Sequence, residues 1–188
     1  DGVPVKKTEE QVLLLFYKPR GIVCSTRKQF NETTVTEYIN YPVRIYPVGR
    51  LDRESEGLLL LTNQGDLVNR IMRAGNYHEK EYQVTVDREI TADFVRKMSE
   101  GIPILDTVTR PCTVEKTGRK SFRIILTQGL NRQIRRMCEY LGYEVESLKR
   151  VRIMNLTLNG LGAGEYRSIN KKEWQELNRR LEGSYSQP

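Results

Sequence analysis

The sequence predicts an α+β fold built on a mixed, mostly antiparallel sheet. Segments with strand character outnumber segments with helical periodicity, and short turns join most neighbouring segments. The pattern does not alternate regularly between strand and helix, so a sheet made of parallel βαβ units is not expected. A chain of 188 residues is long enough for one domain with a sizeable core.

Strands are predicted where apolar residues run together or alternate with polar ones. The four leucines at positions 58–61 are too short a run for a helix and suit a strand buried on both faces. Residues 82–86 alternate with period two, as a half-buried strand does. The same criteria predict further strands at residues 12–17, 22–25, 112–116, 122–127, 145–148 and 153–158.

Helices are predicted from capping residues and helical spacing. Thr34, Asp66 and Asn131 are good N-caps, and Gly101 and Gly142 are good stop signals. These signals predict helices over residues 34–39, 66–73, 91–100, 131–141 and 171–181.

Charge and composition narrow the class of partner. The chain has 31 basic and 24 acidic side chains, a net charge of +7 and a pI near 9.4, which favours a polyanionic partner, most simply a nucleic acid. Basic residues are densest over 131–152, as expected of a patch on a folded surface. Residues 1–10 have the composition of a linker and residues 182–188 that of a tail, leaving residues 11–181 as the folded domain.

Cysteine usage and hydropathy predict an intracellular protein without a metal site. The three cysteines, at positions 24, 112 and 138, are isolated, and with the single His78 they give no zinc or haem spacing. Such sparse cysteines fit a reducing cytosol. No apolar run approaches the ~20 residues of a membrane helix, and no signal-peptide core is found. We therefore expect a cytoplasmic location.

The most informative stretch runs from Pro47 to Gly57, directly before the leucines. Asp52 lies in it between Arg50 and Arg53, and either guanidinium group would stabilise the ionised carboxylate. An ionised aspartate on a loop that enters a rigid strand is a candidate nucleophile. A turn aspartate paired with a surface arginine has the same spacing, so spacing alone leaves both interpretations open.

The longer string G-R-L-D-R-E-S-E-G-L-L-L-L-T-N-Q-G-D-L, at positions 49–67, resembles the aspartate motif of bacterial ribosomal RNA pseudouridine synthases. It is similar to the branch that contains small-subunit synthase A and large-subunit synthases B, E and F, and residues 73–82 resemble the F-type enzymes most. The resemblance covers residues 12–169. It implies the pseudouridine synthase fold, with flanking helices and a central cleft, and it implies that Asp52 is catalytic.

Two further motifs of this family occur in the expected order. The string K-E-Y at positions 80–82 resembles the K-x-Y motif, whose tyrosine stacks on a flipped base, so Tyr82 is the implied stacking residue. By position alone, the simpler interpretation is that Tyr82 begins a strand and packs in the core. The string Q-I-R at positions 133–135 resembles the motif whose arginine pairs with the catalytic aspartate, which implies that Arg135 pairs with Asp52.

Basic residues around these motifs are the expected RNA contacts. Ile134, Met137, Cys138 and Leu141 form a core-facing stripe, which leaves arginines on the other faces of a helix whose N-terminus suits phosphate. The basic stretch after this helix suits contacts with the RNA backbone, although Met154 stands where relatives commonly have glycine. We expect RNA or substrate contacts from Arg50, Lys80, Asn131, Arg132, Arg136, Lys149, Arg150 and Arg152.

The implied reaction isomerises uridine to pseudouridine. It breaks the C–N glycosidic bond, turns the base and rejoins it through carbon, which requires a flipped base and a carboxylate. It needs neither redox chemistry nor a metal, so no cofactor is expected. The implied substrate is ribosomal RNA, foremost the 23S RNA of the large subunit, with a transfer RNA as a second candidate. A monomer is the default state.

Two other functions fit parts of the pattern. A non-catalytic RNA-binding factor in ribosome assembly would use the same arginines, but a carboxylate in its cleft would oppose binding of a polyanion. A glycosidase or nucleosidase would need a second carboxylate, for which Glu54 and Glu56 are candidates if the stretch is extended. Family relatives carry an S4-like RNA-binding domain before the catalytic part, and residues 1–10 would be its end.

Overall fold

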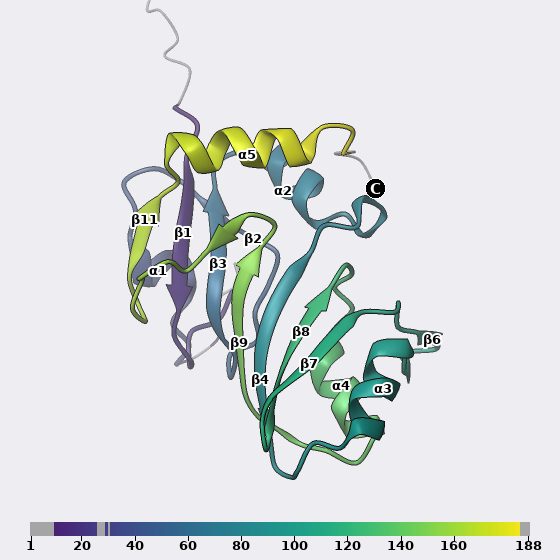
Figure 1. Cartoon of the computed structure of the whole chain (residues 1–188). Helices are drawn as coiled ribbons and strands as arrows, with labels where there is room; N and C mark the ends of the chain where they lie inside the picture. The colour runs from purple at the N-terminus through teal and green to yellow at the C-terminus, as the bar shows by residue number, and fades with distance from the viewer. Residues whose placement is uncertain (1–9, 26–28, 30, 185–188) are drawn as a thin grey trace, which may run out of the picture.

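The computed structural model describes residues 10–25, 29 and 31–184 (Figure 1). The predicted linker, apart from Glu10, and residues 185–188 of the predicted tail lie outside these ranges. The strands are β1 (Leu13–Lys18), β2 (Tyr46–Val48), β3 (Glu56–Thr62), β4 (Lys80–Val86), β5 (Pro103–Ile104), β6 (Thr107–Val108), β7 (Thr113–Gly118), β8 (Ser121–Leu126), β9 (Val145–Ile153), β10 (Leu156–Thr157) and β11 (Tyr166–Ser168). The helices are α1 (Val35–Ile39), α2 (Gly65–Met72), the 3₁₀ helix η1 (Ala74–Asn76), α3 (Ala92–Glu100), α4 (Gln133–Tyr140) and α5 (Lys171–Leu181).

In the part of the chain that the structure describes, the main sheet has nine strands and is mixed but mostly antiparallel, as predicted. Its order is β11-β1-β3-β9-β4-β8-β7, with β2 added to β3 and β10 added to β9. Among the described residues the β3–β9 pairing is parallel and the other pairings of this sheet are antiparallel. Figure 1 shows α5 and α2 across one end of the half formed by β1 and β3, and α3 and α4 beside β7 and β8.

The leucine run forms most of β3 and is buried on both faces. Leu58 and Leu60 pack into a cluster with side chains of α2 and α5. Leu59 and Leu61 pack into a second cluster that includes the buried residues of α1. All four leucines have no exposed surface, which confirms the strand predicted from their uninterrupted run. β3 is therefore a rigid base for the loop that precedes it.

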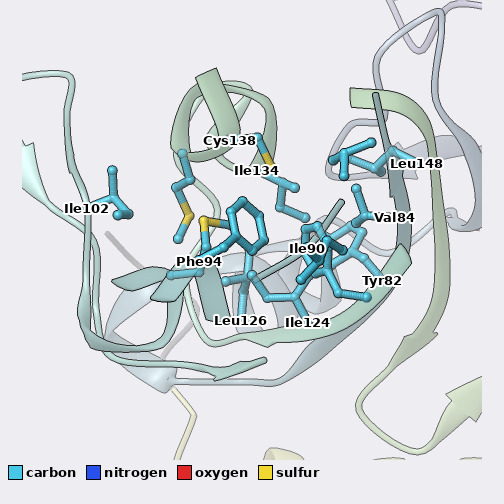
Figure 2. Close-up of a cluster of buried hydrophobic side chains, with 14 of the residues drawn as sticks. Tyr82, Val84, Ile90, Phe94, Ile102, Ile124, Leu126, Ile134, Cys138 and Leu148 are labelled. Atoms are coloured by element: carbon cyan, nitrogen blue, oxygen red, sulfur yellow. The ribbon is translucent and has the colours of Figure 1, made fainter. Parts of the chain in front are cut away.

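The other half of the sheet has its own core, between β4, β8 and β9 and the helices α3 and α4. In Figure 2, Ile124 and Leu126 of β8 point toward Phe94 of α3 and toward Ile134 and Cys138 of α4. These last two residues belong to the apolar stripe predicted for this helix, and both are buried. The stripe therefore fixes α4 against the sheet and orients its arginines.

Several predicted helix ends are confirmed by their hydrogen bonds. Thr34 caps α1 by accepting from the Glu37 amide at 3.3 Å, and Thr91 caps α3 by accepting from the Phe94 amide at 3.0 Å. α3 ends at Gly101, and α5 spans the predicted residues 171–181. No helix in the described part of the chain has the length and apolar character needed to cross a membrane.

Other local predictions are wrong. Asp66 lies inside the first turn of α2, whose N-cap is Gln64. Residues 22–25 contribute one isolated bridge, from Val23 to Thr34, rather than a strand. The predicted strand at 145–148 continues through the basic residues as far as Ile153, because β9 pairs with β4 along its length.

Candidate active site

A cavity of about 390 Å³ opens between the loop before β3 and the N-terminal end of α4. β4 and β9 contribute further side chains to its walls. This position corresponds to the central cleft that the sequence resemblance implied. The cavity is lined by Gly49, Arg50, Leu51, Asp52, Ser55, Met72, Lys80, Tyr82, Leu126, residues 128–135, Leu148 and Arg150.

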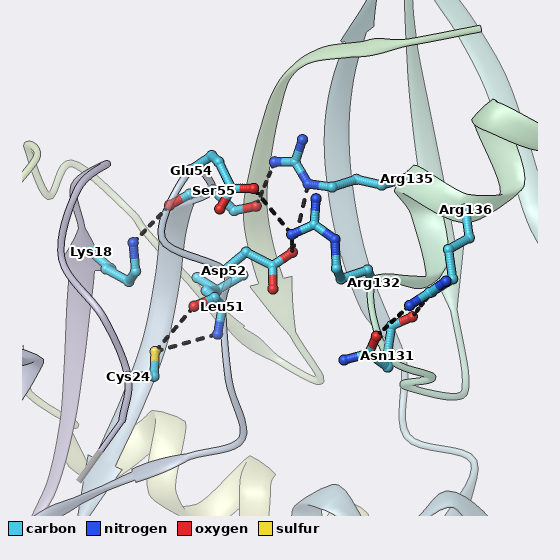
Figure 3. A network of polar contacts seen from close by, with 10 residues as sticks. All are labelled: Lys18, Cys24, Leu51, Asp52, Glu54, Ser55, Asn131, Arg132, Arg135 and Arg136. Carbon is cyan, nitrogen blue, oxygen red and sulfur yellow. Dashed lines mark hydrogen bonds and ion pairs between the residues drawn. The ribbon is translucent and has the colours of Figure 1, made fainter. Parts of the chain in front are cut away.

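The Asp52 carboxylate faces two guanidinium groups from across the cavity (Figure 3). Its Oδ2 atom lies 3.2 Å from Nη1 of Arg132 and 3.6 Å from Nε of Arg135. The predicted pair of Asp52 and Arg135 is thus brought together in space. Arg50 and Arg53, the neighbours in sequence, are exposed. The guanidinium groups that pair with Asp52 therefore come from Arg132 and Arg135, far along the chain, rather than from its sequence neighbours.

The Asp52 loop is held in place by two buried side chains that precede it in the sequence. Cys24 Sγ accepts a hydrogen bond from the Leu51 amide at 3.3 Å and lies 3.4 Å from the Leu51 carbonyl oxygen. Lys18 Nζ donates to the carbonyl oxygens of Ser55 and Pro19, both at 2.8 Å. Burial lowers the pKa of Lys18 to about 8. These contacts fix both ends of the loop.

The arginines of α4 and its N-cap divide into those that reach Asp52 and one that does not. Arg135 is buried and donates from Nη2 to Ser55 Oγ at 2.8 Å, which ties α4 to the Asp52 loop. Arg136 instead donates to the Asn131 carbonyl and side-chain oxygens, at 2.9 and 2.8 Å. In Figure 3 this pair lies apart from Asp52.

The predicted N-cap of this helix is wrong. Arg132 rather than Asn131 occupies the N-cap, in a left-handed conformation with φ of +49°, and it makes no side-chain capping bond. Such a conformation strains a residue with a side chain. Its guanidinium also pairs with Glu54 at 3.1 Å, which positions it above Asp52.

Tyr82 and Lys80 occupy alternate positions on β4 and both line the cavity. Tyr82 is 9% exposed and belongs to the core cluster, so it both packs in the core and forms part of the cavity wall. Lys80 is 4% exposed. Burial, and then the nearby Arg150, lower the pKa of Lys80 to about 8.

The three basic residues predicted on β9 do not share one surface. Arg150 is buried on the cavity side, where its Nε donates to the Leu58 carbonyl at 2.8 Å. Lys149 faces the opposite side of the sheet, where it lines a second cavity and its ammonium lies 5.0 Å from the centre of the Tyr17 ring. Lys149 therefore does not line the Asp52 cavity, and its predicted contact with RNA would have to occur on the other side of the sheet.

Arg152 is also turned away from the Asp52 cavity. The register between β4 and β9 shifts between Glu81 and Tyr82, and this bulge puts Arg152 opposite Glu81 while Arg150 is opposite Tyr82. Arg152 pairs with Glu81 at 2.9 Å and with Glu79 at 3.2 Å. Its charge is thus matched within the protein, and it does not line the predicted pocket.

The three carboxylates of the Asp52 loop do not face one bond. A turn, with the Ser55 amide donating to the Asp52 carbonyl at 3.0 Å, interrupts the extended stretch that the hydrolase hypothesis required. Glu56 accepts a hydrogen bond from the Tyr17 hydroxyl at 2.6 Å and lines the far cavity with Lys149. The structure therefore offers no second carboxylate in the Asp52 cavity from this stretch.

Sequence reasoning missed several residues that shape the site. Lys18, Cys24 and Ser55 hold the loop, and Gln133 organises the other wall. The buried Gln133 side chain accepts from the Leu130 amide at 3.1 Å and donates to Gln128 Oε1 at 3.3 Å. Apart from Gln133, which stands in the Q-I-R string, these residues carried no local signal, because their contacts span long stretches of sequence.

Known proteins resemble this chain over nearly its whole length. The family model for RNA pseudouridylate synthase matches residues 12–140. The dual-specificity RNA pseudouridine synthase RluF of Salmonella typhi is 52% identical over 182 residues, covering 97% of this chain and 63% of the relative. Ribosomal large subunit pseudouridine synthase B of Bacillus subtilis (strain 168) is 36% identical over 94% of this chain and 75% of the relative.

The fold also has a close counterpart among solved structures. A protein described as "Crystal structure of pseudouridylate synthase" matches with a TM-score of 0.84 and 29% identity, over 92% of this chain and 76% of that one. The present chain spans somewhat less than two thirds of the length of the RluF relatives. Because the family model matches more than half of the chain and the fold agrees, the chain belongs to the RNA pseudouridylate synthase family.

Proposed function

We propose that this chain isomerises a specific uridine of ribosomal RNA to pseudouridine, with Asp52 as the catalytic carboxylate. One observation carries the proposal: the Asp52 carboxylate lies 3.6 Å from the buried Arg135 guanidinium in a cavity that Tyr82 also lines. The cavity volume of about 390 Å³ is within the ~300–1,000 Å³ typical of small-ligand sites. A flipped nucleotide is a ligand of that size.

Each side chain has a distinct task in the proposed reaction. Asp52 is the negatively charged group that faces the sugar of the flipped nucleotide. Arg135 and Arg132 balance this charge before RNA arrives and keep the carboxylate oriented. The Tyr82 ring, fixed by the core behind it, stacks on the base. Stacking on an aromatic side chain is worth roughly 1–3 kcal/mol per base, so Tyr82 contributes to holding the base during its rotation.

Large-subunit ribosomal RNA is the proposed substrate class. The Bacillus subtilis relative is named a large-subunit synthase, and the RluF relatives are named dual-specificity enzymes. A second RNA substrate follows from that likeness, and a transfer RNA is our candidate. The net charge of +7 favours binding of any of these polyanions.

The proposed organisation assigns residues 11–181 to the catalytic domain, acting as a monomer in the cytoplasm. Residues 1–10 would then connect it to an S4-like domain that adds RNA affinity, and residues 182–188 would form a tail. The length ratio to the RluF relatives is compatible with a further segment in the whole protein.

The central test is the substitution Asp52→Asn, which keeps the size of the side chain and removes its charge. Incubated with ribosomal RNA, the unaltered protein should form pseudouridine, detected as carbodiimide-dependent stops in primer extension. Asp52→Asn should form none, because no other carboxylate of its loop faces the same bond.

The matched control is Asp66→Asn, which removes the same charge from an exposed position in the first turn of α2. It should retain full activity. Equal signals from Asp52→Asn and Asp66→Asn would overturn the assignment of Asp52. RNA binding without any pseudouridine from the unaltered protein would favour the non-catalytic assembly factor instead.

A further inference from the structure

Lys80 is a buried cation whose ammonium has no partner in the described part of the chain. It is 4% exposed and lines the Asp52 cavity, yet no hydrogen bond or ion pair reaches it from the described residues. Arg150, which is opposite Tyr82 on the neighbouring strand β9, also lines this cavity, and its Nη2 atom is buried without a hydrogen-bond partner. Two cations thus lie beside one cavity with donor capacity left over.

A comparison with Lys18 indicates that the fold does not require a buried lysine to lack a hydrogen-bond partner. Lys18 is also buried, but its ammonium donates to two carbonyl oxygens and holds the Asp52 loop. A structural lysine in this protein is therefore satisfied by the backbone. An unpaired buried charge destabilises the folded state, and residues with strongly perturbed pKa values cluster at functional sites.

The missing partner should be an oxygen that carries negative charge. Arg150 repels a positive group, and its charge helps to lower the pKa of Lys80 to about 8, which leaves the ammonium predominantly protonated near neutral pH. Asp52 is occupied by Arg132 and Arg135 and is not the partner. The ligand itself must therefore bring the acceptor.

The proposed isomerisation creates such an acceptor, and this inference rests on that proposed function. When the C1′–N1 bond breaks, its electron pair stays on the uracil ring, where the charge is shared among N1, O2 and O4. The electron-deficient C1′ is balanced by the Asp52 carboxylate. When C5 bonds to C1′, the proton on C5 leaves and N1 gains a proton, so the product is an isomer and no co-reactant is consumed.

We propose that Lys80 is a further catalytic residue, which stabilises the detached uracil anion by donating a hydrogen bond to one of its carbonyl oxygens. Arg150 acts behind it as a fixed positive charge that touches no substrate atom. Preorganised donors of this kind act where charge develops in the transition state, and loss of one costs about 10²–10³-fold in rate. If O4 is the acceptor, the cation also disfavours cytosine, which presents an amino group at that position.

The test compares two leaving groups in the unaltered protein and in Lys80→Met, which keeps an unbranched side chain without its charge. The substrates are matched RNAs with uridine or 5-fluorouridine at the target position. Fluorine withdraws electrons and makes the detached base a weaker base that needs less stabilisation. We expect Lys80→Met to slow the single-turnover loss of the parent nucleoside about 10²–10³-fold with uridine. With 5-fluorouridine, the factor by which Lys80→Met slows the reaction should be at least ten times smaller.

Two further variants keep this test decisive. Lys80→Arg retains the charge and should recover a large part of the rate that Lys80→Met loses. Lys97→Met removes an exposed charge from α3, far from the lining residues, and should behave as the unaltered protein. Equal slowing on both substrates, or a change within twofold on uridine, would overturn the role of Lys80. Inactivity of the unaltered protein would instead refute the proposed function.

Discussion

At the scale of single residues, the two buried lysines have opposite consequences for stability. Burial lowers the pKa of both Lys18 and Lys80 to about 8, from an ordinary value of 10.5. Lys18 recovers part of this cost through its two hydrogen bonds. Lys80 has no such bonds within the described residues, so its charge is a net burden on the folded state.

We therefore expect Lys80→Met to be more stable than the unaltered protein, by roughly 1–3 kcal/mol at pH 7. The folded-state pKa of Lys80 lies below its unfolded value, so between pH 8 and 10.5 the unfolded chain binds more protons and stability rises with pH. The advantage of Lys80→Met should therefore shrink across this window. Urea unfolding of both proteins at pH 7, 8, 9 and 10 measures the difference.

The difference in unfolding free energy between Lys80→Met and the unaltered protein does not include the contributions of other groups that titrate in this range. Burial raises the pKa of Cys112 to about 11 and that of Cys138 to about 12, and both cysteines are present in both proteins. A less stable variant at pH 7, or an advantage that stays constant with pH, would contradict the assignment of an unpaired buried charge.

At the scale of secondary-structure elements, the parallel junction between β3 and β9 joins the two halves of the sheet. Gly57 pairs there with Arg150 and has φ of +117°, which residues with a side chain rarely adopt. A Cβ atom on Gly57 would lie 2.2 Å from the Arg150 carbonyl oxygen. Arg150 lines the Asp52 cavity and Gly57 lies at the start of β3, directly after the Asp52 loop, so this contact joins two parts of the site.

Gly57→Ala should therefore destabilise the protein by more than about 3 kcal/mol, because backbone strain and a backbone clash add together. Chemical denaturation followed by circular dichroism measures the effect. Gly75→Ala is the matched control, since a Cβ there meets no atom within 4 Å and its φ is not left-handed. A loss below about 1 kcal/mol for Gly57→Ala, as expected of an ordinary surface glycine, would mean that β9 moves to accommodate the methyl group.

Elements with local signals were predictable from the sequence, whereas those set by distant pairing were not. The leucines of β3 and the threonine caps carry their own evidence in burial pattern and side-chain chemistry. The continuity of β9 has no such local signal, because pairing with β4 determines where the bulge opposite Glu81 lies. The same bulge explains why Arg150 faces the cavity and Arg152 does not.

The candidate site divides in the same way. Asp52, Tyr82 and Arg135 lie in strings long enough to identify by resemblance, and all three line one cavity. The N-cap of α4 was mispredicted because the Asn131 side chain accepts a hydrogen bond from Arg136 instead of a helix amide. Lys18 and Cys24 act on the loop from more than 25 residues away, a separation that no local pattern encodes.

At the scale of the whole molecule, the sheet separates basic residues that look alike in sequence. Arg50 is exposed at the rim of the Asp52 cavity, while Lys149 lies on the opposite side of the sheet with Glu56 and Tyr17. Net charge alone treats these residues as equal contributions to RNA binding. Their placement predicts that RNA docks on the Asp52 side.

The salt dependence of RNA binding shows whether Arg50 and Lys149 contribute equally or whether only Arg50, on the Asp52 side, contacts RNA. Each phosphate neutralised by a protein cation contributes about 0.7–0.9 to the slope of log affinity against log salt concentration. Arg50→Gln should reduce the slope by about this amount, because it removes a cation from the docking side. Lys149→Gln lowers the net charge equally and should leave the slope unchanged. Fluorescence anisotropy with a ribosomal RNA stem-loop over a salt series gives both values, and equal reductions would mean that RNA wraps both sides of the sheet.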